Sequence, residues 1–367
     1  IKPDMIITVD NGISNKEGVA RLKELLPDCQ VVITDHHLAP EVLPDADVIV
    51  NPNQKGCDFP SKAVAGCGVA FYLIAAIRSY MVESGHRADY CDIAPLLDLV
   101  AVGTVADVVP LDKNNRILVK AGLDRINRGL ARPGIRALLE VSKRKIGRVI
   151  SSDFGFTVGP RLNAAGRLED MTIGIRCLLS SSYDEATAVA KELDDLNKKR
   201  RSIEQEMRDT AMEDLKGDCN EFGLCFYSPE WHKGVVGIVA SRVKDKANRP
   251  VICFGGVDES GYISGSARSI KGVHLRDLLV EIDVNNEGLI KGFGGHAMAA
   301  GLTIKESDFD KFSAAFDKIV KETVSQETLD GEVMSDGSIP VEHMNLETVS
   351  QLTWITPWGQ GFEEPTF

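Results

Sequence analysis

The 367-residue sequence has no Cys-x-x-Cys pair among its eight cysteines, which are scattered from residue 29 to residue 253. This spacing argues against a zinc ribbon and a disulfide framework, and it favours buried, reduced thiols in a cytoplasmic protein. No apolar run approaches the roughly 20 residues needed to cross a bilayer, and no secretory signal is recognisable. The sequence also has no internal repeat and no low-complexity tract.

Positively charged residues are in the minority. The sequence has 42 Lys and Arg against 54 Asp and Glu, which gives a net charge of −12. That balance argues against a general nucleic-acid coat protein. It does not exclude a metal-dependent phosphoesterase, since bound cations neutralise an acidic site. Residues 113–148 are the exception, with eleven Lys and Arg and two acids. This basic block is either a solvated helical surface or a track for a nucleic-acid backbone.

The length exceeds what one hydrophobic core usually supports, so two domains are predicted. The chain begins with Ile1 rather than Met and ends abruptly at Phe367. We therefore expect it to be an internal piece of a longer protein.

Residues 31–37, Val-Val-Ile-Thr-Asp-His-His, are the stretch around which the chain is organised. The apolar β-branched run predicts a strand buried in a parallel sheet. Asp35, His36 and His37 then lie at its C-terminal end, where α/β folds bind ligands. Neighbouring strand residues face opposite sides, so one His could ligate a metal while the other faces substrate or a carboxylate. The plain alternative is a polar strand end.

Two further acids are candidate metal ligands. Asp10 follows an apolar strand at residues 4–8, with a simple turn cap as the alternative. Asp107 lies near the end of an apolar segment, residues 91–109, which predicts one core helix; a satisfied buried acid is the alternative. With His36 they form an oxygen-rich set that suits Mn²⁺ or Mg²⁺ better than structural Zn²⁺. Three ligands are too few for a two-metal hydrolase.

The remaining pattern alternates helices and strands, which predicts an α/β architecture. The Gly-rich stretch 154–168 is not expected to form a plain helix, and the tail from residue 326 is expected to begin an extended segment. Helices are predicted from Ser14 to residue 26 and at 66–80, 183–215, 235–243, 274–282 and 309–324, and strands at 46–50, 224–227, 251–254, 262–267 and 297–304.

Two motifs in the second half suit an anion. Gly294, Gly295 and His296 are expected to form a turn whose backbone N–H groups can meet a phosphate, although a simple tight turn is the alternative. Ser266 and Arg268 lie in Ile-Ser-Gly-Ser-Ala-Arg-Ser, and a guanidinium group suits bidentate phosphate contact. An exposed strand end is the alternative there.

Several motifs together resemble the DHH phosphoesterase superfamily and, most closely, its bacterial RecJ family of single-strand-specific exonucleases. The resemblance covers nearly the whole chain. Its motifs are Val-Asp-Asn-Gly at 9–12, Asp-His-His at 35–37, Gly-Thr-Val-Ala-Asp-Val-Val-Pro-Leu at 103–111, Gly-Pro-Arg-Leu-Asn-Ala-Ala-Gly-Arg at 159–167, Trp-His-Lys-Gly-Val-Val-Gly-Ile at 231–238 and Gly-Gly-His at 294–296.

The resemblance implies a two-metal site that holds Mn²⁺ or Mg²⁺. Asp10 would bridge the two ions, while His36 and Asp107 would each ligate one. Asp35 would orient the site, and His37 would face the scissile phosphate or leaving group. The residues implied to hold the DNA are Arg161, Asn163, Arg167, Ser266, Arg268, Gly294, Gly295 and His296.

The resemblance also implies two α/β domains joined by a long helix, with a cleft between them. The expected parts are a DHH domain at 1–182, a connecting helix at 183–217, a DHH-associated substrate-binding domain at 218–325 and the start of a linker at 326–367. The linker would lead to an oligonucleotide-binding domain beyond Phe367. The family's first motif, Asp-x-Asp, is absent and is expected upstream of Ile1. The isolated chain would then lack ligands of both metal sites and be impaired.

The implied activity is 5′-to-3′ hydrolysis of single-stranded DNA in repair and recombination, by a cytoplasmic monomer that needs no membrane. A single-strand-binding protein and a RecQ-type helicase are the partners that the resemblance suggests. The alternatives are a DHH phosphoesterase for oligoribonucleotides or cyclic dinucleotides, and a non-catalytic DHH-derived scaffold. The basic block and residues 159–167 favour long DNA over a small substrate. The presence of Asp10, His36 and Asp107 argues against the scaffold.

Overall fold

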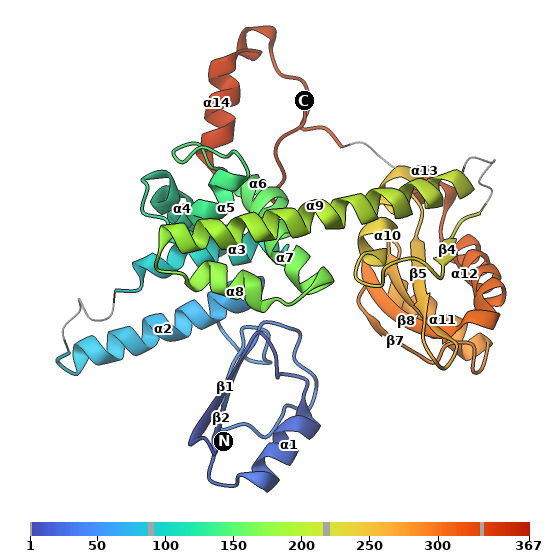
Figure 1. Ribbon diagram of the computed structural model, residues 1–367, viewed down its shortest axis with the longest axis horizontal. Coiled ribbons are helices and arrows are strands. Elements are labelled where there is room, and N and C mark those ends of the chain that lie inside the picture. The colour runs from blue at the N-terminus through green and yellow to red at the C-terminus, as the bar shows by residue number, and fades with distance from the viewer. Residues whose placement is uncertain (1, 87–91, 216–220, 331–333) are drawn as a thin grey trace. The chain divides into compact units, whose positions relative to one another are not determined.

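A computed structural model of the chain describes residues 2–86, 92–215, 221–330 and 334–367. These residues form two compact units. Each unit combines a β-sheet with helices, which confirms the predicted α/β fold class (Figure 1). Unit 1 comprises Ile1–Ala165, Met171–Asp194 and Ser335–Phe367, and unit 2 comprises Gly166–Asp170 and Asp195–Met334.

Unit 1 begins with a three-stranded parallel sheet in the order β1–β2–β3. The central strand is buried as predicted, with Val31 1% and Ile33 0% exposed. The pattern of the first strand is that of a buried strand, but Met5, Ile7 and Val9 are exposed because they share one face of β1 that is not covered by the described residues of unit 1. The strands are β1 (Met5–Val9), β2 (Gln30–Thr34) and β3 (Val48–Val50).

Helix α1 (Lys16–Leu25) connects β1 to β2 and gives the predicted strand–helix–strand order. Its N-cap is Asn15 rather than the predicted Ser14, since the Asn15 side chain accepts a hydrogen bond from the Gly18 N–H at 3.1 Å. Asn is a strong N-cap residue because its side-chain oxygen satisfies one of the free N–H groups of the first turn.

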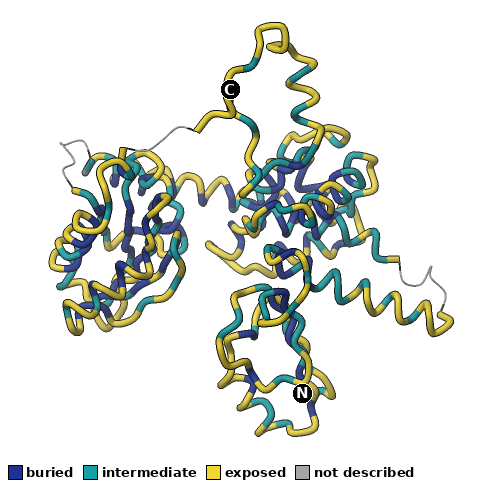
Figure 2. The backbone as a smooth tube through the Cα atoms, turned by 180° about the vertical axis from the view of Figure 1, so that it is seen from behind, coloured by how far each residue is buried: buried dark blue, intermediate teal, exposed yellow. Residues whose placement is uncertain are grey.

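A series of helices follows the sheet, and Figure 2 shows many of the buried residues of unit 1 among them. The predicted helix at 66–80 is confirmed and extends to Glu83. These helices are α2 (Gly66–Glu83), a 3₁₀ turn (Ala94–Leu96), α3 (Leu97–Ala106), α4 (Lys113–Asn127), α5 (Pro133–Val141), α6 (Ser151–Asp153), a π-helical turn (Phe154–Val158), α7 (Gly159–Leu168) and α8 (Thr172–Leu179).

The single core helix predicted at 91–109 is wrong at its C-terminal end. Helix α3 ends at Ala106, and Asp107 is its C-cap. Val108 has a φ of +61°, a left-handed conformation that no α-helix continues. The start of the predicted helix, up to residue 91, lies outside the described residues.

The Gly-rich stretch is helical throughout, although one turn of it, Phe154–Val158, is a π-helix. The expectation that this stretch does not form a plain helix is therefore wrong for residues 159–168, which are α-helical, and only the turn before them departs from an α-helix. Single π-turns inside helices occur often at functional sites.

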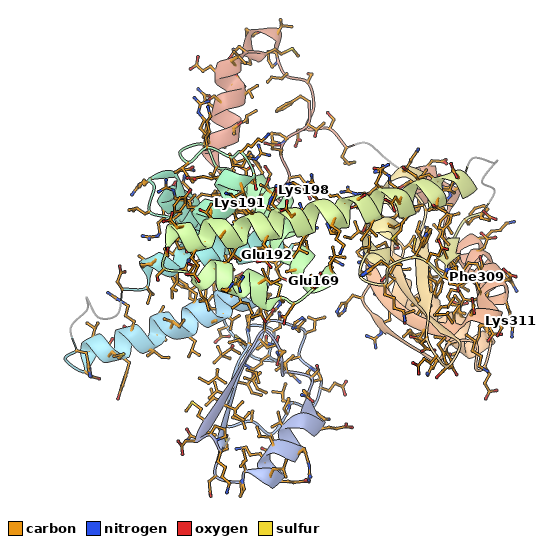
Figure 3. All side chains as sticks on the ribbon, viewed as in Figure 1. Glu169, Lys191, Glu192, Lys198, Phe309 and Lys311 are labelled. Atoms are coloured by element: carbon orange, nitrogen blue, oxygen red, sulfur yellow. The ribbon has the colours of Figure 1, made fainter. Side chains whose placement is uncertain are left out.

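The long helix predicted at 183–215 is confirmed as α9 (Tyr183–Asp214), and Figure 3 labels Lys191, Glu192 and Lys198 along it. Its first twelve residues belong to unit 1 and the rest to unit 2. In unit 1, Glu192 pairs with Arg176 of α8 at 3.2 Å.

Unit 2 has a five-stranded mixed sheet in the order β4–β5–β6–β8–β7. Helix α10 and the end of α9 cover one face, where Val251 and Cys253 point. Helices α11 and α12 cover the other face, where Phe254 contacts Phe309 and Phe312. The elements are β4 (Leu224–Ser228), α10 (Val236–Ala247), β5 (Val251–Val257), β6 (Tyr262–Arg268), α11 (Leu275–Asn285), β7 (Gly292–Gly295), β8 (Ala299–Lys305), a 3₁₀ turn (Glu306–Asp308), α12 (Phe309–Thr323) and α13 (Gln326–Asp330).

Two predictions for this half are wrong. Residues 292–295 form strand β7 rather than a turn, because they pair with β8. The tail is not extended, because it contains α13, a 3₁₀ turn (Val341–His343) and helix α14 (Leu346–Ile355).

Six cysteines are free thiols within the described residues, and three of them, Cys29, Cys177 and Cys253, are buried as predicted. The other two of the eight, Cys91 and Cys219, lie outside the described residues. One helix among the described residues, α2, is long and apolar enough to cross a membrane by length and composition alone, although no such run was expected from the sequence. Only 17% of this helix is buried, at Gly66, Gly68 and Val69 in its first turn.

Candidate metal centre

The polar residues that follow β1 and β2 lie at one edge of the parallel sheet. The register pairs Val9 with Thr34, the last residues of the two strands, and the Asp10 N–H donates to the Thr34 carbonyl at 2.9 Å. Because parallel strands end at the same edge, Asp10 and Asp35 are brought side by side. The predicted placement of acids and imidazoles at strand ends is therefore confirmed.

Asp35 is a buried carboxylate, 1% exposed, that organises the loop after β2. One oxygen accepts the N–H groups of His36 (2.7 Å) and His37 (3.2 Å), and the other accepts the Ile13 N–H (2.9 Å). Burial raises the pKa of Asp35, but the hydrogen bonds from Ile13, His37 and His36 outweigh burial, and the net pKa lies below its usual value.

We expect Asp35→Asn to lower the free energy of unfolding by about 1–3 kcal/mol at pH 7, because an amide NH₂ would face N–H donors in a buried site. The lowered pKa means that the carboxylate stabilises the fold above the unfolded pKa of about 3.9, and that this stability is lost as pH falls through the folded pKa. The difference between the two proteins should therefore shrink in acid.

Urea unfolding at several pH values measures this difference. Asp45→Asn is the matched control, since Asp45 is an exposed acid of the same sheet region. Equal destabilisation by both variants would contradict the assigned role of Asp35.

The three predicted metal ligands come together at this edge. His36 Nε2 lies 3.1 Å from an Asp10 oxygen and 3.6 Å from an Asp107 oxygen. Ligand atoms of Asp10, His36 and His37 all lie within 4.8 Å of one another. Carboxylate and imidazole groups that converge in this way can share a divalent cation.

Asp107 was expected to be surrounded by apolar residues. It is instead partly exposed, at the C-cap of α3. Partial burial still raises the pKa of Asp107, and the Asp10 carboxylate raises it further against the opposing effect of His36. A cation bound between the two carboxylates would relieve this repulsion.

His36 and His37 do not face opposite sides of a strand, because both follow the last residue of β2. Their ring centres lie 4.6 Å apart with the planes tilted by 54°. His37 Nδ1 lies 2.7 Å from the inner oxygen of Asp35. One imidazole thus faces the proposed metal ligands while the other is held by a carboxylate.

Two residues beside the site have left-handed backbones. Asp10 has a φ of +63° and Val108 a φ of +61°. This conformation is uncommon for Asp and a steric outlier for the β-branched Val. Such strain persists where the surroundings fix the chain, and it clusters at functional sites.

Gly66, the first residue of α2, was not singled out from the sequence. A Cβ atom on Gly66 would lie 2.2 Å from an Asp10 carboxylate oxygen. Only glycine therefore allows α2 to start against this carboxylate. The positive end of the helix dipole also favours an anion at that place.

Asn51 and Asn53, which follow β3, were not singled out from the sequence as parts of the site. The Asn53 amide donates to the His36 carbonyl at 2.6 Å, and the Asn51 amide donates to the His37 carbonyl at 3.0 Å. They hold the backbone of the two histidines. A pair of amides directly after a third parallel strand is the sequence signal that could have identified them.

Most of the predicted substrate residues of unit 2 lie on β6 and β7, two strands that β8 separates. Ser266 of β6 pairs with Gly301 of β8, which pairs with Gly294 of β7. Two residues further along β6, Arg268 pairs with Ala299 of β8. The Ala299 carbonyl accepts a hydrogen bond from the His296 N–H at 2.9 Å.

Arg268 has no carboxylate partner among the described residues. Burial lowers its pKa, and the nearby Arg167 lowers it further. An Arg268 nitrogen would lie 2.9 Å from a Cβ placed on Gly237, in the first turn of α10. A part-buried guanidinium without an acid, beside a second Arg and a helix N-terminus, suits an anion.

The predicted substrate residues are divided between the two units, with Arg161 and Asn163 in unit 1 and the others in unit 2. The Arg161 guanidinium contacts Asp194 at 2.8 Å and the Thr157 carbonyl at 2.7 Å, so it serves contacts within unit 1. Asn163 is exposed on α7. Arg167 belongs to unit 2, where it donates to the Gly234 carbonyl at 2.8 Å.

Much of the basic block has partners inside unit 1, which favours the alternative of an ordinary helical surface. The strongest of these contacts is Arg132 to Asp98, an acid 1% exposed, at 2.9 Å. The other ion pairs are Lys120–Asp124, Arg136–Glu140 and Arg144–Asp153.

Comparison with known protein families matches both halves of the chain. The DHH family, N-terminal domain, matches residues 2–104, and the DHHA1 domain matches residues 220–322. The first range contains Asp10 and the Asp35-His36-His37 motif. The second contains Ser266, Arg268 and the Gly-Gly-His motif.

Curated relatives carry the name single-stranded-DNA-specific exonuclease RecJ. That of Salmonella typhimurium is 50% identical over 99% of this chain, and that of Escherichia coli is 48% identical over 99%. The chain spans 64% of the length of each.

Comparison with solved structures points to the same family. RecJ from Thermus thermophilus in complex with Mn²⁺ has a TM-score of 0.82 at 32% identity, over 99% of this chain and 51% of that one. A second structure, exonuclease RecJ bound to manganese, has a TM-score of 0.71 at 33% identity, over 89% of this chain and 78% of that one. The chain therefore belongs to the RecJ family of DHH proteins.

Proposed function

We propose that this chain is the nuclease part of a single-strand-specific 5′-to-3′ exodeoxyribonuclease that acts in DNA repair and recombination. The observation that carries the proposal is the convergence of Asp10, His36 and Asp107 at one sheet edge, with His36 Nε2 3.1 and 3.6 Å from the two carboxylates. The names of the relatives at about 50% identity support the same activity.

The donor set fits the proposed divalent cations, Mn²⁺ or Mg²⁺, because two carboxylates and one imidazole offer mainly hard oxygen ligands. Relatives of known structure were solved with manganese or magnesium. We propose that Asp10 bridges two ions and that His36 and Asp107 each bind one. When bound, such ions supply a hydroxide near neutral pH and stabilise charge on the phosphoryl group.

The residues around these ligands have separate proposed tasks. The Asp35 carboxylate holds His37 through its Nδ1 contact of 2.7 Å and orients the loop that carries both imidazoles. His37 is proposed to face the scissile phosphate or the leaving group. Its side chain is 54% exposed, so a substrate can reach it.

The DHHA1 region is proposed to hold the phosphates of the DNA. Ser266 and Arg268 lie on β6, and Gly294 and Gly295 lie on β7, with β8 between these two strands. His296 follows β7 directly. Arg167 adds a second guanidinium near Arg268. Phosphate contacts of this kind bind without base specificity and weaken as salt rises.

We propose domain limits of 1–182 for the catalytic domain, 183–217 for the connecting helix and 218–325 for the substrate-binding domain. The matched ranges of the two family models support the first and third. Residues 326–367 are proposed as the start of a linker, although Ser335–Phe367 pack with unit 1 in the structure. A cytoplasmic monomer with a single-strand-binding protein and a RecQ-type helicase as partners completes the proposal.

The function is tested by incubating the 367-residue chain and the full-length gene product with a long 5′-phosphorylated single strand, its duplex and a dinucleotide. We expect Mn²⁺-dependent release of mononucleotides from the long single strand by the full-length product. Faster cleavage of the dinucleotide would favour a small-substrate phosphoesterase. No hydrolysis by the full-length product with either metal would favour a non-catalytic scaffold.

We expect Arg268→Gln to weaken binding of single-stranded DNA about tenfold at low salt, with the same loss for different sequences, because one phosphate contact disappears. The slope of log affinity against log salt should fall by about 0.7. Arg276→Gln is the control, since Arg276 is exposed on α11 of the same unit. Fluorescence anisotropy measures both, and an unchanged affinity would remove Arg268 from the binding site.

A further inference from the structure

The loop that follows Asp107 is in contact with a segment from the far end of the chain. This segment, residues 357–362, Pro-Trp-Gly-Gln-Gly-Phe, is called here the C-terminal strap. It belongs to unit 1, as does the loop from Val108 to Asp112. Nothing in the proposed chemistry uses the strap directly.

The backbone of the strap lies directly against the loop. The Leu111 N–H donates to the Gln360 carbonyl at 2.7 Å. A Cβ on Gly359 would lie 2.7 Å from a methyl carbon of Leu111, and one on Gly361 would lie 3.4 Å from Pro110. A side chain at 359 would therefore push the two segments apart, whereas Gly361 lies in ordinary contact with the loop.

The strap is itself anchored to the helices of unit 1. The Ser151 hydroxyl donates to the Trp358 carbonyl at 2.6 Å. The Trp358 and Phe362 rings stack with centres 5.1 Å apart, and the Arg116 guanidinium lies 4.0 Å from the Phe362 ring centre. Arg116 also donates to the Leu111 carbonyl at 2.7 Å, so it contacts both the strap and the loop.

The loop is also held from within unit 1, where the Asn115 amide donates to the Pro110 carbonyl at 2.8 Å, and the strap borders its other side. A cavity of about 500 Å³ lies there, and Val108, whose φ is +61°, is one of its walls. The position of this strained residue therefore depends on the contacts at Pro110 and Leu111. The walls of the cavity include Val105, Val108, Val109, Phe156, Trp354 and Trp358.

We propose that the C-terminal strap is a positioning element of the metal centre, which holds the Asp107 carboxylate beside His36 by fixing Pro110 and Leu111. This inference rests on the proposed metal-dependent function and extends it to residues remote in sequence. The strap residues do not contact the metal ligands, so their effect passes through the loop. It follows that weakening the strap lowers affinity for the metal more than it lowers turnover at saturating metal.

The test compares Phe362→Leu and Gly361→Ala with Leu346→Ala in the full-length protein. Phe362→Leu removes the ring that stacks on Trp358 and Arg116. Gly361→Ala strains the strap at a φ of +66° without removing buried apolar surface. Leu346 is 88% exposed on α14 in the same C-terminal region and serves as the control. Mn²⁺ binding is followed by electron paramagnetic resonance, and hydrolysis is followed as a function of Mn²⁺ concentration.

We expect both strap variants to weaken Mn²⁺ binding about tenfold and to recover most of the rate when Mn²⁺ is raised, as for residues that orient metal ligands. The control should match the wild type. A strap variant with a lowered Tm but unchanged Mn²⁺ affinity would overturn the inference and leave the strap a purely stabilising segment. If Phe362→Leu does not fold, the Mn²⁺ affinity of Gly361→Ala alone tests the inference by the same criteria.

The outcomes for the wild type separate the inference from the proposed function. A wild type that binds Mn²⁺ but does not hydrolyse DNA refutes the nuclease, while the binding data still decide the role of the strap. A wild type that binds no Mn²⁺ refutes the metal centre and the inference together.

Discussion

Replacing Asp107 by Ala is expected to lower Mn²⁺-dependent hydrolysis of single-stranded DNA by about a hundredfold or more, because one of the converging metal ligands is lost. The same change should not destabilise the metal-free protein. Burial raises the Asp107 pKa, and the Asp10 charge adds to this rise against the opposing effect of His36, so the charged form is disfavoured in the fold. Removing the Asp107 carboxylate at neutral pH relieves its repulsion with Asp10. The Tm of the metal-free variant should therefore equal or exceed that of the metal-free wild type.

The combination of lost activity and retained stability distinguishes a metal ligand from a structural acid. Asp45→Ala is the control, since Asp45 is an exposed carboxylate of the same unit. The measurements are initial rates over a range of Mn²⁺ concentrations and thermal unfolding with and without Mn²⁺. Wild-type rates in the Asp107→Ala variant would refute the proposed metal centre, and so would Mn²⁺ stabilising this variant as strongly as the wild type.

Gly66→Ala is expected to weaken metal binding by about 10- to 100-fold, the range seen when groups that orient metal ligands are changed. The new methyl group would lie 2.2 Å from the Asp10 carboxylate oxygen and 2.8 Å from the Asp10 Cβ. The carboxylate must therefore move, and its left-handed backbone at a φ of +63° leaves few alternative positions.

Gly155→Ala provides the matched control for this prediction. A Cβ on Gly155 would lie 3.5 Å from a Val105 methyl, an ordinary contact, in the same unit. Isothermal titration with Mn²⁺ measures the affinity, and rates at high Mn²⁺ test for rescue. If Gly66→Ala binds Mn²⁺ as the wild type does, the close contact with Asp10 does not govern the site.

The core of the candidate site could be predicted from the sequence because its signals are local. An apolar β-branched run fixes the strand before Asp35, and the parallel arrangement brings strand ends together, so Asp10 and His36 were expected to meet. The helix before Asp107 was predicted to be too long, because composition alone does not show that Val108 leaves the helical conformation. Pro110, which cannot continue a helix, was the signal to stop earlier.

The remaining errors and omissions concern contacts between segments distant in sequence. The role of Gly66 becomes visible only when α2 is packed against Asp10. The role of the Asn51 and Asn53 amides becomes visible only when β3 is paired with β2. Residues 292–295 are rich in glycine, which predicts a turn, yet pairing with β8 makes them a strand. Tertiary contacts override local propensity in each case.

The hydrogen bond between Asp35 and His37 fixes where the protons of that imidazole reside. With a carboxylate oxygen 2.7 Å from Nδ1, this nitrogen carries the hydrogen in either charge state. The neutral ring is thus the Nδ1–H tautomer, and its Nε2 lone pair is left to accept a proton. Of the two nitrogens, Nε2 is therefore the atom through which His37 exchanges protons with whatever reaches the exposed side of the ring.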